Sequence, residues 1–209
     1  MQASRAPLKS ILSTFIIALS AFASPLNALA EAIVGAPAPE FSAKDSTGKE
    51  VTLQGLRGKI VVLEWFNPGC PFVKKFYKNG DMQKMQQELQ EKGVVWLTVS
   101  SSAPGKSGHL TPESAEETRS ELKMKSSALL LDESGTIGKA YGARTTPHIF
   151  VVNSDGKLAY AGAIDSEAST SSSDIAGATN YLVGAVDALR AGKQVSPSST
   201  DAYGCSVKY

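Results

Sequence analysis

The sequence predicts an α/β fold in which a mixed central β-sheet is flanked by helices. Two observations support this prediction. Strand-like and helix-like segments alternate along most of the chain, and the pattern then finishes in a hairpin followed by a helix. Alternation of this kind is typical of a sheet covered by helices, and a terminal hairpin adds antiparallel strands to it. We therefore expect one mixed sheet, preceded by a short β extension.

The expected β extension consists of two short strands, residues 41–43 and 51–53. They flank the segment Asp45-Ser46-Thr47-Gly48. Asp and Ser hydrogen-bond the local backbone and Gly tolerates left-handed conformations, so this segment predicts a turn. The two strands should therefore pair as a hairpin.

Three runs of β-branched and large apolar residues predict strands that are buried on both faces. They cover residues 60–66, 94–99 and 128–131. A hairpin should follow, because residues 149–152 and 158–161 surround a turn-forming segment with the sequence Asn-Ser-Asp-Gly. These segments supply the strands of the sheet.

Helical sequence lies between the first two central strands and is interrupted at Asn79-Gly80. Asp81 could cap a second helix, which Gly93 would end. Further helices are expected over residues 113–123, 137–141 and 181–189.

The N-terminus has the pattern of a secretory signal peptide. Arg5 and Lys9 precede an apolar stretch over residues 11–22, and Ala28-Leu29-Ala30 is a small-x-small cleavage pattern. The apolar stretch is about half of the ~20 residues that a membrane span needs. We expect cleavage after Ala30, which leaves residues 31–209 as one periplasmic or secreted domain without stable membrane insertion. An uncleaved anchor is the alternative.

The charge balance gives no indication of a nucleic-acid partner. The chain has 21 basic and 20 acidic side chains, and the leader contributes two of the basic ones and none of the acidic ones. The two histidines and two cysteines lack the short spacing of a metal site, so we expect neither a metal nor another cofactor. Export would place both cysteines where disulfides can persist.

Cys70 is expected at the N-terminus of a helix. Residues 67–69, Asn-Pro-Gly, turn the chain after a central strand, and Pro71 suits the first helical position. Backbone N–H groups and the helix dipole favour a thiolate there, and the thiolate is the reactive form. Two other interpretations stay open: Cys70 is a small buried apolar side chain, or it forms a structural disulfide with Cys205.

Two motifs carry a family resemblance. The run EWFNPGCPFV, residues 64–73, resembles the active-site segment of thioredoxin-like proteins. Thr145-Thr146-Pro147 before a hairpin looks like their cis-proline loop. The stretch DESGTIGKAYGARTTPHIFVVN, residues 132–153, is similar to the redoxin branch, which contains alkyl hydroperoxide reductase and thiol-specific antioxidant. The resemblance covers residues 36–189 and implies a thioredoxin-like fold.

By this resemblance Cys70 corresponds to the attacking cysteine of a C-x-x-C motif, and Pro147 to the cis-proline that packs against it. Val73 stands where the second cysteine is expected. Cys205, in the polar tail over residues 192–209, is then the internal candidate for a resolving cysteine or for a standing disulfide. The long separation costs little, because loop-closure entropy grows only logarithmically with length.

The resemblance also implies roles for neighbouring residues. Glu64 corresponds to a buried acid beneath the active site, with a raised pKa and a proton-transfer role, although it could instead face a polar edge of the sheet. His148 could lie near the thiol and titrate near neutral pH, or be satisfied in the core. The candidate substrate-binding residues are Asn67, Pro71 and Thr146.

Three function classes remain. The first is a thiol-disulfide oxidoreductase that acts on protein thiols or disulfides. The second is a peroxidase, but Leu63, Asn67 and Pro147 occupy the positions where peroxiredoxins carry peroxide-binding Pro, Thr and Arg. The third is a non-catalytic binding module with a structural disulfide. Two long loops, residues 100–112 and 165–174, could shape a groove for a partner.

Overall fold

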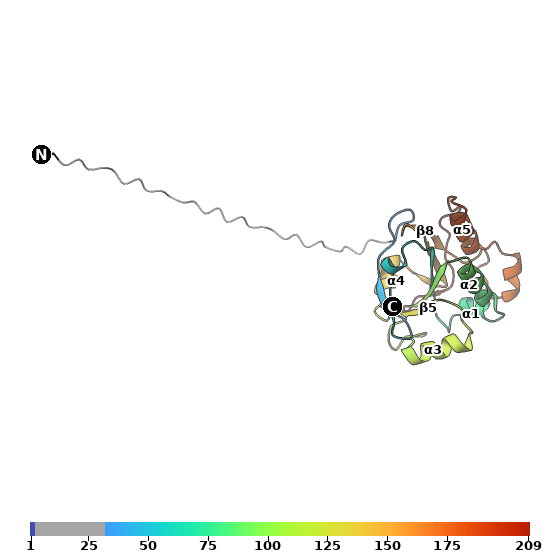
Figure 1. The fold of residues 1–209 in the computed structure, drawn as a ribbon. Helices are drawn as coiled ribbons and strands as arrows, with labels where there is room; N and C mark the ends of the chain where they lie inside the picture. Colours follow the sequence, from blue (N-terminus) through green and yellow to red (C-terminus); the bar gives the residue numbers. More distant parts are fainter. Residues whose placement is uncertain (3–31) are drawn as a thin grey trace.

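The computed structural model describes residues 1–2 and 32–209 (Figure 1). Apart from its first two residues, the expected signal peptide lies outside the described residues. The strands are β1 (Ser42–Lys44), β2 (Glu50–Thr52), β3 (Val61–Trp65), β4 (Val95–Ser100), β5 (Ala128–Leu131), β6 (Thr145–Thr146), β7 (His148–Val152), β8 (Leu158–Gly162) and β9 (Cys205–Ser206). The α-helices are α1 (Pro71–Tyr77), α2 (Asp81–Glu91), α3 (Pro112–Glu121), α4 (Thr136–Tyr141) and α5 (Tyr181–Arg190), and two 3₁₀ helices are η1 (Gln54–Leu56) and η2 (Ser172–Gly177).

The central sheet has five strands in the order β5-β4-β3-β7-β8. Strands β3, β4 and β5 are parallel, whereas β7 and β8 are antiparallel to their neighbours. Every residue of β3 and β7 is buried, as expected for central strands that are covered on both faces. The predicted mixed sheet and the predicted hairpin extension β1–β2 are therefore confirmed.

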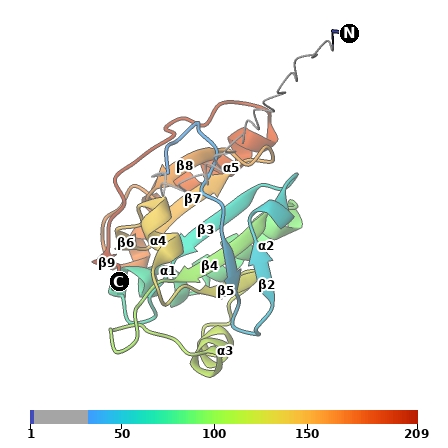
Figure 2. The same cartoon turned by 90° about the vertical axis from the view of Figure 1, so that its left-hand side faces the viewer.

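Alternation along the strands divides the core into two clusters, one on each face of the sheet. Val62 and Phe66 point to the face that is covered by α1, α2 and α5, and Cys70 belongs to this cluster. Leu63 and Trp65 point to the opposite face, where α4 and the β1–β2 hairpin pack. Figure 2 shows the sheet between these layers, with α3 at its lower end. The active-site candidates can thus be assigned to one face or the other.

Two local details differ from the sequence-based expectations. Asp81 does not cap α2; the N-cap is Gly80, which has a φ of 88°, and Asp81 lies in the first turn. The C-terminal tail forms an unexpected strand, β9, which pairs with β6. Two residues are too few to produce a recognisable strand pattern in the sequence, so this pairing could be seen only in the folded chain.

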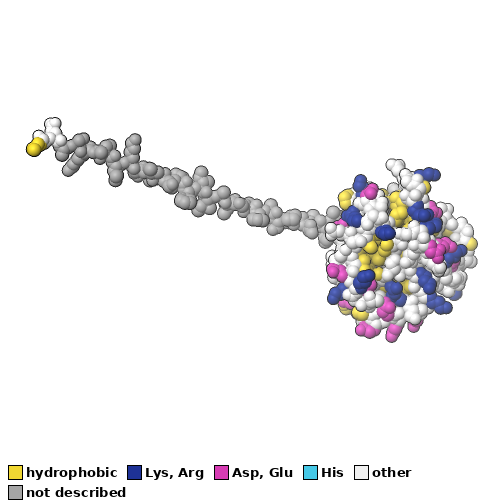
Figure 3. Space-filling view, viewed as in Figure 1, with side chains coloured by type: hydrophobic (Ala, Val, Ile, Leu, Met, Phe, Trp, Pro, Cys, Tyr) yellow, Lys and Arg dark blue, Asp and Glu magenta, His cyan; other side chains and the backbone are white. Residues whose placement is uncertain are grey.

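Basic and acidic side chains are interspersed on the face that Figure 3 shows, consistent with the nearly neutral composition. Among the helices of the described residues, none combines the length and the apolar character that crossing a membrane requires.

Candidate active site

The turn between β3 and α1 places Cys70 at the N-cap of the helix, with Pro71 in the first turn. Asn67 builds this turn: its side-chain oxygen accepts the Gly69 N–H at 2.8 Å, and its carbonyl oxygen accepts the Cys70 N–H at 3.1 Å. The amide of Asn67 also donates to the carbonyl oxygen of Ser107 at 3.0 Å. Asn67 is buried, so its visible role is to shape the turn, while Pro71 is exposed.

The sulfur of Cys70 lies against the loop that contains a cis peptide bond between Thr146 and Pro147. Its Sγ donates to the carbonyl oxygen of Thr146 at 3.0 Å. The cis geometry expected at Pro147 is confirmed. Cys70 is only 2% exposed in this conformation, so the sulfur is buried. Its position at a helix start agrees with the sequence, but the C-terminal tail covers it.

The tail brings Cys205 to the same place. Strand β9 runs antiparallel to β6, with Cys205 opposite Thr146. Cys205 packs against the core cluster that contains Cys70, each thiol affects the pKa of the other, and both cysteines are free. Cys205 is half-buried. A thiol from the end of the chain thus meets the one at the start of α1.

The surroundings shift the pKa values of the two thiols in opposite directions. Burial raises the pKa of Cys70, but hydrogen bonds from the Cys205 and Thr146 side chains and from backbone N–H groups outweigh it, so the pKa lies below its ordinary value. Burial, and then the hydrogen bond to Cys70, raise the pKa of Cys205 to about 11. Cys70 is therefore the more acidic thiol of the pair, and Cys205 the less acidic one.

Glu64 is fully buried beneath α1, as the family resemblance implies, and does not face a polar edge of the sheet. Burial raises its pKa to about 7 although four side chains hydrogen-bond the carboxyl group. Tyr77, at the C-terminal end of α1, donates at 3.0 Å, and Trp96 Nε1 donates at 2.9 Å. Within residues 32–209, no hydrogen bond links Glu64 to Cys70. The direction of this pKa shift agrees with what the resemblance implies, whereas a role in proton transfer stays a prediction.

His148 does not lie where the sequence suggested. It follows Pro147, but in β7 it is paired with Trp65 and packs on Phe150, at 4.4 Å between ring centroids, on the face opposite Cys70. Its Nδ1 accepts the Arg144 N–H at 3.3 Å. Burial lowers its pKa to about 4, with the Arg144 charge acting in the same direction. The expectation that it titrates near neutral pH beside the thiol is wrong.

Comparison with known proteins identifies the family. A family model described as AhpC/TSA matches residues 34–161, which is more than half of the chain. The chain belongs to the AhpC/TSA family.

Two relatives, each described as thiol-disulfide oxidoreductase ResA, are from Bacillus thuringiensis subsp. konkukian (strain 97-27) and Bacillus cereus (strain ATCC 10987 / NRS 248). Each is 26% identical over 125 residues, which span 60% of this chain and 66% of the relative, just under two thirds of its length.

Two solved structures share the fold of this AhpC/TSA family member. An uncharacterized conserved protein from Geobacillus kaustophilus has a TM-score of 0.73 and 24% identity, covering 85% of this chain and 92% of that protein. A hypothetical protein from Sinorhizobium meliloti 1021 has a TM-score of 0.72 and 23% identity, covering 85% of this chain and 94% of the other. At these identities the likeness concerns the fold alone.

The AhpC/TSA match ends before the tail, so Cys205 lies outside the matched residues. Arg144, the nearest arginine to the cis-proline in sequence, is exposed and lines a cavity of about 410 Å³ together with His148, on the side of the sheet away from Cys70. No hydrogen bond or ion pair joins Arg144 to Cys70 within the described residues. The peroxide-handling groups that are absent from the sequence are not replaced by this arginine.

The sequence analysis missed a buried ion pair next to the site. Lys75, on α1, has a fully buried side chain, and its Nζ lies 3.2 Å from Asp165 Oδ2. Tyr203 donates to the same carboxylate. Lys75 falls among the apolar positions of α1, which is a signal that its side chain is buried. Adjacent Lys74 obscured this signal, because one of two neighbouring lysines is normally exposed.

Proposed function

We propose that this protein is an exported thiol-disulfide oxidoreductase whose redox pair is Cys70 and Cys205. The observation that carries the proposal is the pairing of β9 with β6, which brings Cys205 next to the threonine that the Cys70 sulfur contacts. Family membership and the similarity to proteins described as thiol-disulfide oxidoreductases support a redox function. The leader sequence supports export.

The chemistry follows from the two pKa directions. The Cys70 thiolate attacks one sulfur of a substrate disulfide, whose S–S bond breaks and releases a first thiolate. Cys205 then loses its proton to solvent or to that thiolate and attacks the Cys70 sulfur. The second substrate thiolate leaves, and a Cys70–Cys205 disulfide forms. The substrate gains two electrons, and an external dithiol must return them to the protein.

Access to Cys70 requires β9 to separate from β6, because the tail covers the sulfur. A two-residue strand makes few ladder hydrogen bonds, so this separation needs only a local opening. Once β9 has left, the backbone of Thr146 can accept another extended segment, which is the usual way an edge strand binds a peptide. Pro71 is exposed beside Cys70 and would border such a segment. Protein disulfides are therefore the substrate class that we propose.

Equilibration with mixtures of reduced and oxidised glutathione, followed by alkylation and peptide mass mapping, tests the proposal. The parent protein should show one transition, from two alkylated thiols to a linked Cys70–Cys205 peptide pair. Cys205→Ser should accumulate a mixed disulfide with glutathione at Cys70. If both thiols of the parent remain alkylatable under excess oxidised glutathione, the redox pair does not exist.

Peroxide reduction is the second candidate, and the AhpC/TSA match favours it. The Cys70 thiolate would attack one peroxide oxygen, an alcohol or water would leave, and the sulfenic acid would condense with Cys205 to release water. Leu63, Asn67 and Pro147 at the peroxide-binding positions argue against rapid reaction. Oxidation rates of the reduced protein by hydrogen peroxide and by a disulfide peptide, compared at equal concentrations, separate the two candidates.

A further inference from the structure

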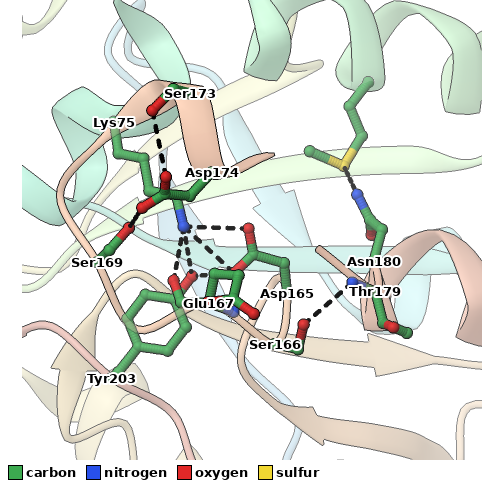
Figure 4. A network of polar contacts seen from close by, with 11 residues as sticks. Lys75, Asp165, Ser166, Glu167, Ser169, Ser173, Asp174, Thr179, Asn180 and Tyr203 are labelled. Carbon is green, nitrogen blue, oxygen red and sulfur yellow. Dashed lines mark hydrogen bonds and ion pairs between the residues drawn. The ribbon is translucent and has the colours of Figure 1, made fainter. Parts of the chain in front are cut away.

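The tail that carries Cys205 is tied to helix α1 by a buried polar network (Figure 4). The Nζ of Lys75 donates to the Asp165 carboxylate at 3.2 Å, to the Glu167 carbonyl oxygen at 2.6 Å and to the Tyr203 hydroxyl at 3.4 Å. Tyr203 in turn donates to Asp165. Its ring packs on Phe72, with 5.9 Å between the ring centroids. We call Lys75, Asp165 and Tyr203 the tail clamp.

The tail clamp joins the two segments whose relative position sets the distance between the sulfurs. Lys75 and Phe72 belong to the helix that has Cys70 as its N-cap, and Tyr203 precedes Cys205 by two residues. Gly204 between them has a φ of 136°, and a Cβ there would lie 2.1 Å from the Thr146 carbonyl oxygen. The segment from Tyr203 to Cys205 therefore has little freedom.

The charges of the tail clamp also argue for a specific purpose. The side chain of Lys75 is 0% exposed and that of Asp165 is 2% exposed. Burying two charges is costly, and such a pair often stabilises a fold no better than apolar residues would. A buried ion pair does fix the local geometry. Its donor groups are removed from water and find acceptors in only one arrangement of the surrounding residues. Here that arrangement includes Tyr203 and hence the tail.

We propose that Lys75, Asp165 and Tyr203 are positioning residues that hold the Cys205 thiol at Cys70. This inference rests on the proposed redox pair. When a substrate displaces β9, the tail clamp keeps the segment before Cys205 attached to α1. Cys205 then stays at high effective concentration near the mixed disulfide at Cys70 and resolves it rapidly.

The test measures the resolution step directly. Reduced protein is mixed with excess oxidised glutathione, quenched with acid at intervals, and the Cys70–glutathione and Cys70–Cys205 species are quantified by mass. Tyr203→Ala should slow conversion of the first to the second by about tenfold, as the tethered thiol becomes less confined. Tyr203→Phe keeps the ring on Phe72 and should slow it by roughly threefold, from the lost hydrogen bonds alone.

Tyr181→Phe is the matched control, because the Tyr181 hydroxyl makes no hydrogen bond within the described residues; its conversion rate should equal that of the parent. A second readout separates positioning from general damage. In a Cys205→Ser background, Tyr203→Ala should leave the pH midpoint of Cys70 attack on glutathione disulfide unchanged, whereas the rate itself should rise because the loosened tail covers the sulfur less. A shifted midpoint would mean that Tyr203 acts on the Cys70 thiol itself and would overturn the inference.

The two proposals fail in different ways. If the parent forms the mixed disulfide but never the Cys70–Cys205 bond, the redox pair is wrong. If the parent forms that bond and Tyr203→Ala forms it equally fast, the pair stands and the tail clamp has no positioning role.

Discussion

Cys205 lies opposite Thr146 in the antiparallel pair of β9 with β6. The carbonyl oxygen of the same threonine is 3.0 Å from the Sγ of Cys70. One backbone segment, directly before the cis-proline, therefore contacts both cysteines. Val73 stands where the helix motif would have its second cysteine, and Cys205 is the thiol that we propose takes that role.

Cys205→Ala should raise the pKa of Cys70. The side chain of Cys205 is the largest of the hydrogen-bonding contributions that lower this pKa, and alanine cannot donate. Alkylation of Cys70 measured against pH by peptide mass should therefore reach half-maximal rate at a higher pH than in the parent. Cys205→Ser, whose hydroxyl can still donate, should shift the midpoint less. An unchanged midpoint in the alanine variant would contradict the polarised pair.

Glu64→Gln should remove a pH dependence of stability. The folded pKa is about 7 and the ordinary value is 4.5, so the folded state binds more protons between these values. The contribution of Glu64 to the free energy of unfolding is fully present below about pH 4.5 and is lost as the pH rises through 7. The total loss is roughly 3 kcal/mol. His148, whose pKa is lowered, changes stability with pH in the opposite direction. The pH dependence of the parent's stability alone therefore does not isolate the effect of Glu64.

The measurement is the difference between the variant and the parent in urea unfolding at pH 5 and at pH 8. The substituted glutamine side chain keeps an acceptor and a donor for the surrounding groups but does not titrate. The variant should therefore gain stability relative to the parent on going from pH 5 to pH 8. A difference that stays constant over this range would show that the carboxyl group does not titrate there.

Lys75→Met should destabilise the fold strongly, because it leaves the buried Asp165 carboxylate without its cation. We expect a loss of about 3–5 kcal/mol in the free energy of unfolding. Lys92 is the matched control: it pairs with Asp187 at 3.1 Å, but both side chains are partly exposed, at 37% and 50%. Lys92→Met should cost no more than about 1 kcal/mol. Equal losses in urea titrations of the two variants would count against the buried pair.

Gly138→Ala should destabilise the protein although alanine favours helices. A Cβ at Gly138, in α4, would lie 2.5 Å from the hydroxyl oxygen of Tyr209 and 2.9 Å from Oγ of Ser101, so the end of the tail has to move. Gly184, in α5, has no atom within 4 Å of the corresponding Cβ position. Gly184→Ala should therefore stabilise by about 0.5–1 kcal/mol.

Thermal unfolding of the two alanine variants checks this contrast. Tyr209→Ala should recover part of the loss in Gly138→Ala, since it removes the closer of the two contacts. Similar stabilisation by both alanine substitutions would mean that the C-terminal residue does not pack on α4.

Much of the framework could be predicted from local patterns. The apolar run before residue 67 indicated the central strand, and Asn-Pro-Gly followed by Pro71 indicated the turn and the helix start at Cys70. Thr146-Pro147 indicated the cis loop by resemblance. Each of these features depends on the conformational preferences of a few adjacent residues, and those preferences follow directly from the residue types.

The neighbours of Cys70 could not be predicted in the same way. The helical position of Lys75 gave only a weak indication that it differs from Lys74, and the packing of Asp165 and Tyr203 around α1 decides which of the two lysines is buried. The position of His148 depended on which face of β7 it would occupy, and the pairing with β3 decided that.

By itself, the sequence determined that Cys70 starts a helix and which sheet supports that helix. Only the tertiary structure decided what covers the Cys70 thiol and which side chains lie beside it. Adjacent residues set backbone conformation through short-range sterics and hydrogen bonds, whereas the contact between Cys70 and Cys205 depends on a tail whose route is set by buried contacts spread over the whole domain.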